Sequence, residues 1–330
     1  MTARRDKGSP FALAPWLLPS VGLLAVAFGA AVLVGALLSR TPAFAIKDLP
    51  HDALCAAADP AKVNATEAFR FYAADARQLA MFTLLCVAAG IALVASAAAA
   101  RSTARQCGKD SGCPKSALVI TFVVGLALAG AHVIRVVWWD SGSGFLTRLL
   151  QVLPSGGSCD VIRGRVLAAR LVGETAGFIV GTAMAGVAVF GDAKEVVAGR
   201  IQMLQRLLYC ASLLFVAGLL VSGANFALVL SNWVGSVDEK VSKALQEVIS
   251  GGTAQAGVGY SALITVFYLP IRIYLASKVP PGDVAAKKEA SDAPKVAGIN
   301  LVWLDEAKQI LALLAPVLAA PIFDAIAKTK

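Results

Sequence analysis

The chain has 330 residues, of which 58% are hydrophobic and only 15% are charged, and its mean hydropathy is +0.72. These values exclude an ordinary soluble domain, in which roughly half of the residues are apolar and about a quarter are charged. Most of the charge, net +9, falls between long apolar stretches. The sequence therefore predicts an all-α, polytopic helical membrane protein in contact with the lipid bilayer.

Six stretches are long enough to cross a membrane. A spanning helix needs about 20 mostly apolar residues, because each residue rises about 1.5 Å and the hydrocarbon core is roughly 30 Å thick. Together the stretches form a transmembrane domain over residues 1–278, with outer loops at 39–78, 138–170 and 234–259. The predicted spans are 11–38, 79–100, 116–137, 171–190, 207–233 and 260–277.

The first stretch has two readings. It is followed by Ala43-Phe44-Ala45, a small-x-small pattern typical of a signal-peptidase site. However, 11–38 is much longer than the roughly 7–15 apolar residues of a signal peptide. The length favours an uncleaved membrane anchor.

The end of the chain is expected to form a basic cytoplasmic linker at 279–300 and an amphipathic helix at 301–330. The apolar run of this helix is shorter than a span and contains Pro316 and Pro321. These features suit an interfacial or re-entrant helix better than a crossing.

Orientation follows from Lys and Arg, because basic loops resist translocation. Basic residues are denser in the short segments 1–10, 101–115 and 191–206 than in the three predicted outer loops. We therefore expect a multi-pass protein of the inner cell membrane with both termini in the cytoplasm.

The predicted topology indicates which cysteines lie on the oxidising side of the membrane and which on the reducing side. Cys55 and Cys159 lie in predicted outer loops, where an oxidising compartment permits a disulfide, although two unpaired residues are an equally good reading. Cys107 and Cys113 lie in a predicted inner loop and should stay reduced. A zinc site needs about four ligands, and this loop offers two thiols and no His, so no metal is expected.

Two outer segments show the capping-box spacing of a helix start. One begins at Asn64 and runs into the second span, so this helix should project from the membrane. The other begins at Ser236, has one apolar face and is predicted to stop at Gly251 and Gly252. We expect it to lie flat on the outer surface.

Polar residues inside the spans provide the candidate site. Glu174 is placed about one turn below the outer interface, at a depth close to that of Arg135, and Arg170 precedes it by one turn of the same helix. His132 and Asn225 reach the same leaflet from other spans. Because an isolated charge in hydrocarbon costs several kcal/mol, such residues pair with one another or face a cavity. They predict either a solute or ion site or a purely structural ion pair.

Gly173, Gly177 and Gly181 are spaced four apart on one face of the fourth span. This GxxxG pattern lets a neighbouring helix approach closely, so it predicts helix packing within the chain or between copies of it. In the sixth span, Pro270 and Arg272 lie toward the inner end. Proline can kink a helix, which makes the pair a candidate inner gate, although a kinked helix with a snorkelling arginine is the favoured explanation.

Catalytic signatures are not found: the sequence has no HExxH, GxSxG or Walker motif and only two His residues. We therefore expect no enzyme activity, no cofactor and no nucleic-acid partner. The leading hypothesis is an integral inner-membrane protein that binds or passes a small solute or ion through a polar site in the outer leaflet. The alternative is a non-enzymatic membrane-complex subunit or scaffold, whose glycine face and outer amphipathic helix contact partner proteins or further copies of the chain.

Overall fold

The computed structural model describes residues 65–109, 115–138, 158–189, 195–231, 239–277 and 301–328. Within these ranges all regular structure is α-helical, which confirms the predicted fold class. The helices are α2 (Ala65–Lys109), α3 (Lys115–Trp138), α5 (Ser158–Val187), α6 (Glu195–Ser231), α7 (Glu239–Ser277) and α9 (Leu301–Lys328).

Four of these helices contain apolar stretches long enough to cross a membrane, as the sequence predicts. The helix predicted at 116–137 is present as α3, but its apolar stretch, Leu118–Ile134, is shorter than a typical span. The predicted first span and the adjoining cleavage motif lie outside the described residues. The long apolar stretches are Tyr72–Cys107, Asp160–Val187, Gly199–Leu228 and Ala256–Leu275.

Several helices extend beyond the apolar stretches that define them. The 45 residues of α2 measure about 68 Å at 1.5 Å per residue, more than twice the hydrocarbon thickness. The predicted loop 138–170 is wrong in its second part, because α5 begins at Ser158. The predicted stop at Gly251 and Gly252 is also wrong, since α7 continues through both residues. A glycine costs a helix only about 1 kcal/mol, which long helical flanks offset.

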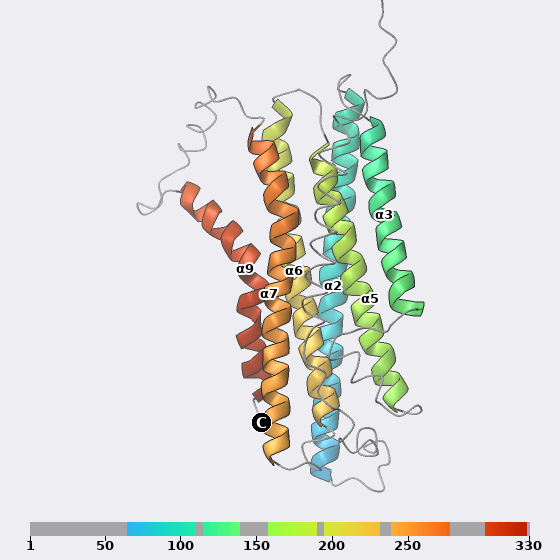
Figure 1. Cartoon of the computed structure of the whole chain (residues 1–330), viewed down its shortest axis with the longest axis vertical. Helices are drawn as coiled ribbons and strands as arrows, with labels where there is room; N and C mark the ends of the chain where they lie inside the picture. The colour runs from blue at the N-terminus through green and yellow to red at the C-terminus, as the bar shows by residue number, and fades with distance from the viewer. Residues whose placement is uncertain are drawn as a thin grey trace, which may run out of the picture.

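The helices form a bundle in which successive helices run in opposite directions (Figure 1). α6 is central and packs against α2, α5, α7 and α9. α3 packs mainly against α5, whereas α9 packs against α6 and α7, so α3 and α9 occupy opposite edges of the bundle. The main apolar core lies between α2, α5, α6 and α7.

α9 lies lengthwise along the bundle. Ser212 Oγ on α6 donates to Ala312 O at 2.6 Å, and seven residues further along both helices Leu219 and Ala319 share a buried cluster. α9 therefore runs parallel to α6 and alongside the middle of its apolar stretch. The prediction of a C-terminal helix is confirmed, and these contacts show that it packs along α6, whereas its interfacial or re-entrant placement stays a prediction. The predicted linker 279–300 lies outside the described residues.

A buried arginine ties three helices together at one end of the bundle. Arg200 is 1% exposed, and its Nη1 donates to Val187 O (3.1 Å) and Val189 O (3.0 Å) at the end of α5, and to Thr103 Oγ1 of α2 (3.3 Å). A cation is favourable at a helix C-terminus, where backbone carbonyls lack partners. The segment 191–206, predicted as an inner loop, is helical from Glu195 onward. Its residue Arg200 links α6 to α2 and α5 through buried hydrogen bonds.

Cys107, buried at the end of α2, is disulfide-bonded to a partner outside the described side chains. The prediction that this thiol stays reduced is therefore wrong in this structure. The sequence alone gives no reason to expect this bond. The close spacing of Cys107 and Cys113 raises the question of a metal site, and a location on the inner, reducing side argues against a disulfide.

Gly173, Gly177 and Gly181 of α5, called the glycine ladder below, each lie beneath a side chain from a different helix. A Cβ placed on Gly173 would lie 3.7 Å from Leu85 of α2, one on Gly177 would lie 3.3 Å from Phe215 of α6, and one on Gly181 would lie 2.9 Å from Phe267 of α7. The ladder thus accommodates three large side chains within the chain.

These distances predict a graded response to alanine. Gly173→Ala should be neutral or slightly stabilising, Gly177→Ala should have a small effect, and Gly181→Ala should cost about 1 kcal/mol, because the added methyl group forces Phe267 to move. Thermal unfolding of the purified variants in one detergent checks the order. Equal losses at all three positions would contradict it.

Candidate functional site

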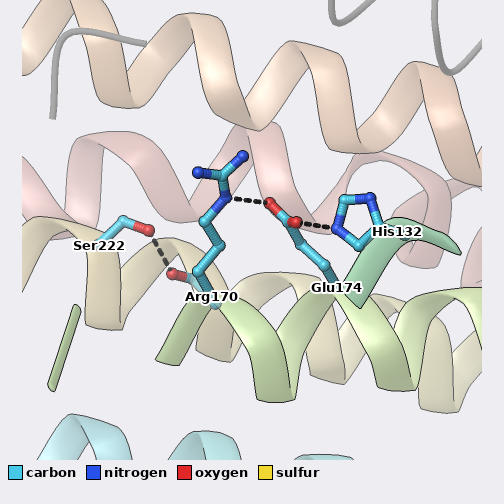
Figure 2. Close-up of polar contacts among 5 residues, drawn as sticks. His132, Arg170, Glu174 and Ser222 are labelled. Atoms are coloured by element: carbon cyan, nitrogen blue, oxygen red, sulfur yellow. Dashed lines mark hydrogen bonds and ion pairs between the residues drawn. The ribbon is translucent and has the colours of Figure 1, made fainter. Parts of the chain in front are cut away.

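Glu174, His132 and Arg170 form a charged triad between α3 and α5 (Figure 2). Arg170 Nε donates to Glu174 Oε1 at 3.0 Å, one helical turn away on α5. The other carboxylate oxygen, Oε2, contacts Nε2 of His132 from α3. The side chains are 28%, 32% and 16% exposed for arginine, glutamate and histidine, so the triad is mostly enclosed by protein.

The packing of α3 on α5 delivers His132 to the triad. Gly125 faces Thr182 and Gly186 faces Phe122, so each helix contributes a residue without a side chain where the other is bulky. At the triad itself, the His132 ring lies 4.9 Å from the ring of Phe178 on α5. Because α3 packs mainly on α5, this contact is the main one that sets the position of the histidine.

Hydroxyl groups on α6 and α7 belong to helices that contact α5, and Tyr260 of α7 is close enough to the triad to be affected by the charges of Glu174 and Arg170. Ser222 on α6 lies beside Arg170 and donates to Gly218 O at 2.9 Å (Figure 2). On α7, Tyr260 stacks on Phe215 with ring centroids 4.9 Å apart. The next residue, Ser261, is 7% exposed, and its hydroxyl has no hydrogen-bond partner. Nearly all buried polar groups are hydrogen-bonded, so this free hydroxyl is an exception that a ligand or water could satisfy.

Asn225 belongs to a second polar network that joins α2, α5 and α6. Its Oδ1 accepts a hydrogen bond from Gln78 Nε2 at 3.0 Å, and both residues are at most 2% exposed. Gln78 Oε1 in turn accepts from Arg165 Nη1 at 3.3 Å, and the same Nη1 pairs with Asp75. The sequence places Asn225 with the triad, whereas the structure gives it a different partner.

The Gln78–Asn225 pair predicts a non-additive response. Asn225→Leu alone leaves the Gln78 amide without an acceptor and should cost about 1 kcal/mol, whereas Gln78→Leu combined with Asn225→Leu should cost less than either single change. A double-mutant cycle of unfolding midpoints measures this coupling. Additive losses would mean that the pair contributes nothing as a unit.

The residues of this second network were not predicted as site residues, because the helices extend beyond the predicted spans. The predicted topology puts Arg165 in a loop and Asp75 and Gln78 in a region before the second span, so none is expected at membrane depth. The available signal is the pattern that begins at Ser158, where Asp160 in the first turn suits a helix N-terminus and apolar residues then recur at helical spacing.

The other predicted site residues are placed separately. Arg135 lies one turn beyond His132 on α3, but its side chain is outside the described set, as are Cys55 and the Cys159 side chain. Pro270 lies inside an unbroken α7, and Arg272 follows it near Tyr268, whose hydroxyl donates to Gln309 of α9 at 2.6 Å. Nη1 of Arg272 is buried without a partner.

The triad can exchange protons or bind charge. Glu174 has one fixed cationic partner and one partner, His132, whose charge depends on protonation, so a proton or a charged solute could change how the carboxylate is paired. Among the described residues no group of three His, Cys, Asp or Glu side chains could hold a metal ion. No family model, curated protein or solved structure matches the chain.

Proposed function

We propose that this membrane protein binds or passes a small solute or ion at the triad of Glu174, His132 and Arg170. The observation that supports the proposal is a carboxylate inside the apolar stretch Asp160–Val187 that contacts a histidine from a neighbouring helix. Ionisable groups at this depth are costly and mark solute or proton pathways in many membrane proteins. The protein acts in this proposal without enzymatic chemistry and without a cofactor.

A second observation supports binding over a purely structural ion pair. The unpartnered hydroxyl of Ser261 and the hydroxyl of Ser222 come from α7 and α6, two of the four helices that contact α5. A structural pair needs only its own two charges, whereas a solute site also needs donors and acceptors that are free to turn toward the ligand.

The proposed orientation places the end of α2 in the cytoplasm, at the inner cell membrane. This end of the bundle carries Arg101, Arg105, Lys115, Arg200 and Arg206. The opposite end is also basic, with Arg70, Arg77, Arg163, Arg165, Lys240 and Lys243, so the orientation is supported by the density of basic residues in the short segments 101–115 and 191–206. The triad then lies toward the outer face. The disulfide of Cys107 argues for the reverse orientation, because disulfides persist in oxidising compartments.

Labelling on intact cells decides the orientation. Single cysteines replace Lys115 at the start of α3 and Asp160 near the start of α5, both exposed, in a cysteine-free background. An impermeant maleimide should react with position 160 and reach position 115 only after permeabilisation. The reverse result would place the triad in the inner leaflet.

The sequence predicts a cytoplasmic C-terminus, and we propose the opposite location because of the direction of α9. α9 runs antiparallel to α7 and lies beside the middle of the α6 span, so we place its end toward the outer face and no longer in the cytoplasm. The same reagent applied to a cysteine after Lys330 tests this placement separately from the orientation of the remaining helices.

The function itself is tested with cysteines that preserve the site. Ser222→Cys and Ser261→Cys are nearly isosteric, and Ser212→Cys is the matched control, because the Ser212 hydroxyl is buried between α6 and α9. Positions 222 and 261 should react with a small thiol reagent several-fold faster than position 212. A panel of small anions, cations and neutral solutes is then screened for protection.

Glu174→Gln is the decisive variant. If one class of solute protects the cysteine introduced at position 222, the protection should disappear in Glu174→Gln, while the variant remains folded and monodisperse in detergent. Equal, slow labelling at positions 222, 261 and 212, without protection by any solute, would overturn the proposal and leave the triad as a structural ion pair.

The scaffold alternative is favoured by one surface. Val87, Ile91 and Val94 of α2 are 46–71% exposed and form a continuous apolar face that lipid or another protein must cover. The glycine ladder, in contrast, is already occupied by side chains of the same chain. A scaffold should therefore lose its partners when α2 is changed and keep them in Glu174→Gln.

A further inference from the structure

A groove of about 560 Å³ runs along one face of α2, far from the triad. Its lining changes in character along the helix. Val94, Ala97 and Ala98 form an apolar floor, and Arg101, Ser102, Arg105 and Gln106 follow where the apolar stretch ends. The groove is thus apolar toward the middle of the bundle and basic at its end.

The polar part of the groove has unused binding capacity. Arg101 and Arg105 are exposed, and within the described part of the chain neither pairs with a carboxylate. The Gln106 side-chain carbonyl oxygen is buried and accepts no hydrogen bond from the protein, so a ligand reaches it when the side chain turns into the groove. Spaced four residues apart, the two guanidinium groups point from the same side of the helix.

We propose that this groove binds one anionic phospholipid of the phosphatidylglycerol type. The phosphate lies between Arg101 and Arg105, an acyl chain covers Val94, Ala97 and Ala98, and a headgroup hydroxyl donates to the free carbonyl of Gln106. Guanidinium groups bind phosphate oxygens in bidentate geometry. Basic sites next to the ends of membrane helices are typical binding sites for anionic lipids.

The apolar and basic parts of the groove distinguish this site from arginines that merely extend to the membrane interface. A snorkelling arginine only reaches the interface and shows no preference among headgroups. Here two cations, an acceptor without a donor and an adjoining apolar groove match a single amphiphile, with charge and apolar surface in the right order. The proposal does not depend on the triad or on which leaflet the site occupies.

Native mass spectrometry of the full-length protein tests the site. Purified protein is titrated with phosphatidylglycerol and, separately, with phosphatidylcholine of the same acyl chains. The wild-type protein should retain phosphatidylglycerol at a lower concentration than phosphatidylcholine. Arg101→Gln with Arg105→Gln should weaken phosphatidylglycerol binding by about thirty-fold, since each interfacial charge contributes about five-fold.

Two further variants separate the possible explanations. Arg206→Gln removes an exposed arginine of α6 outside the groove and should leave binding unchanged. Ala98→Trp keeps both cations but fills the apolar floor of the groove, so it should weaken phosphatidylglycerol binding. In the wild-type protein, free glycerol phosphate should not displace the bound phosphatidylglycerol.

Several outcomes would overturn the proposal. They are equal affinity for both lipids, an equal loss in Arg206→Gln, or full competition by glycerol phosphate, which would indicate a site for a soluble phosphate. Efficient cross-linking of a cysteine at Ala97 to one in the segment 11–38 would show that the first apolar stretch of the chain fills the groove instead.

Discussion

Gly125→Ala should destabilise the protein by about 2–3 kcal/mol and separate His132 from Glu174. An added Cβ would overlap the Thr182 side chain, whose own Cβ would lie only 2.7 Å away. Thr182 cannot turn aside freely, because its hydroxyl donates to Phe178 O at 2.8 Å. Overpacking of this kind typically costs about 1–3 kcal/mol, and here the strain falls on the main contact that holds α3.

Gly130→Ala is the matched control, because it lies on the same helix and an added Cβ meets nothing within 4 Å. It should be neutral or stabilise the helix by up to about 1 kcal/mol. The measurement is the thermal unfolding midpoint of both variants in one detergent. Cross-linking between cysteines at Phe122 and Gly186 reports the separation of the helices directly. Equal stability of the two alanine variants would show that α3 is not held by this contact.

The core of the triad could be predicted from sequence because its residues obey local rules. Arg170 and Glu174 are one helical turn apart, so their contact needs no knowledge of the fold. His132 was included in the predicted site because its depth in its span matches that of Glu174, and because an unpaired carboxylate in an apolar setting is costly. Pattern and electrostatics together thus placed these three residues in one leaflet along with Arg135 and Asn225, and the contact of His132 with Glu174 is seen only in the structure.

The position of Asn225 could not be predicted in the same way. Depth alone made it a neighbour of Glu174, but rotation about the α6 axis directs it to Gln78 of α2. Rotation depends on which helices pack together, and the sequence alone does not state that α6 is central. Helix ends were the other source of error, since α5 and α7 begin well before the spans predicted at 171–190 and 260–277 and carry polar residues such as Arg165 into the bundle.

Glycines show most clearly what a sequence pattern leaves open. The GxxxG ladder of α5 is the conspicuous motif, yet side chains lie over it. Among the described glycines, Gly257 of α7 is the one where an added Cβ would meet the backbone of another helix, 2.6 Å from Pro316 O of α9. Because Gly257 and the α9 proline are far apart in the sequence, only the tertiary structure connects them.

Gly257→Val should therefore detach α9 from the bundle, with a loss of about 3 kcal/mol or more. The obstacle is backbone, which cannot rotate out of the way as a side chain can, so the whole helix must shift. The shift would also break contacts further along α9, including the hydrogen bonds of Ser212 to Ala312 O and of Tyr268 to Gln309.

Cross-linking between cysteines at Leu219 and Ala319 measures the docking, since both residues lie in one buried cluster. The cross-link should form efficiently in the parent protein and be lost in Gly257→Val. Gly251→Val, on the same helix with open space around it, is the control and should keep the cross-link. If Gly257→Val still cross-links fully, α9 tolerates a displacement at Pro316, and its position beside α6 must be maintained by the Ser212 and Gln309 contacts alone.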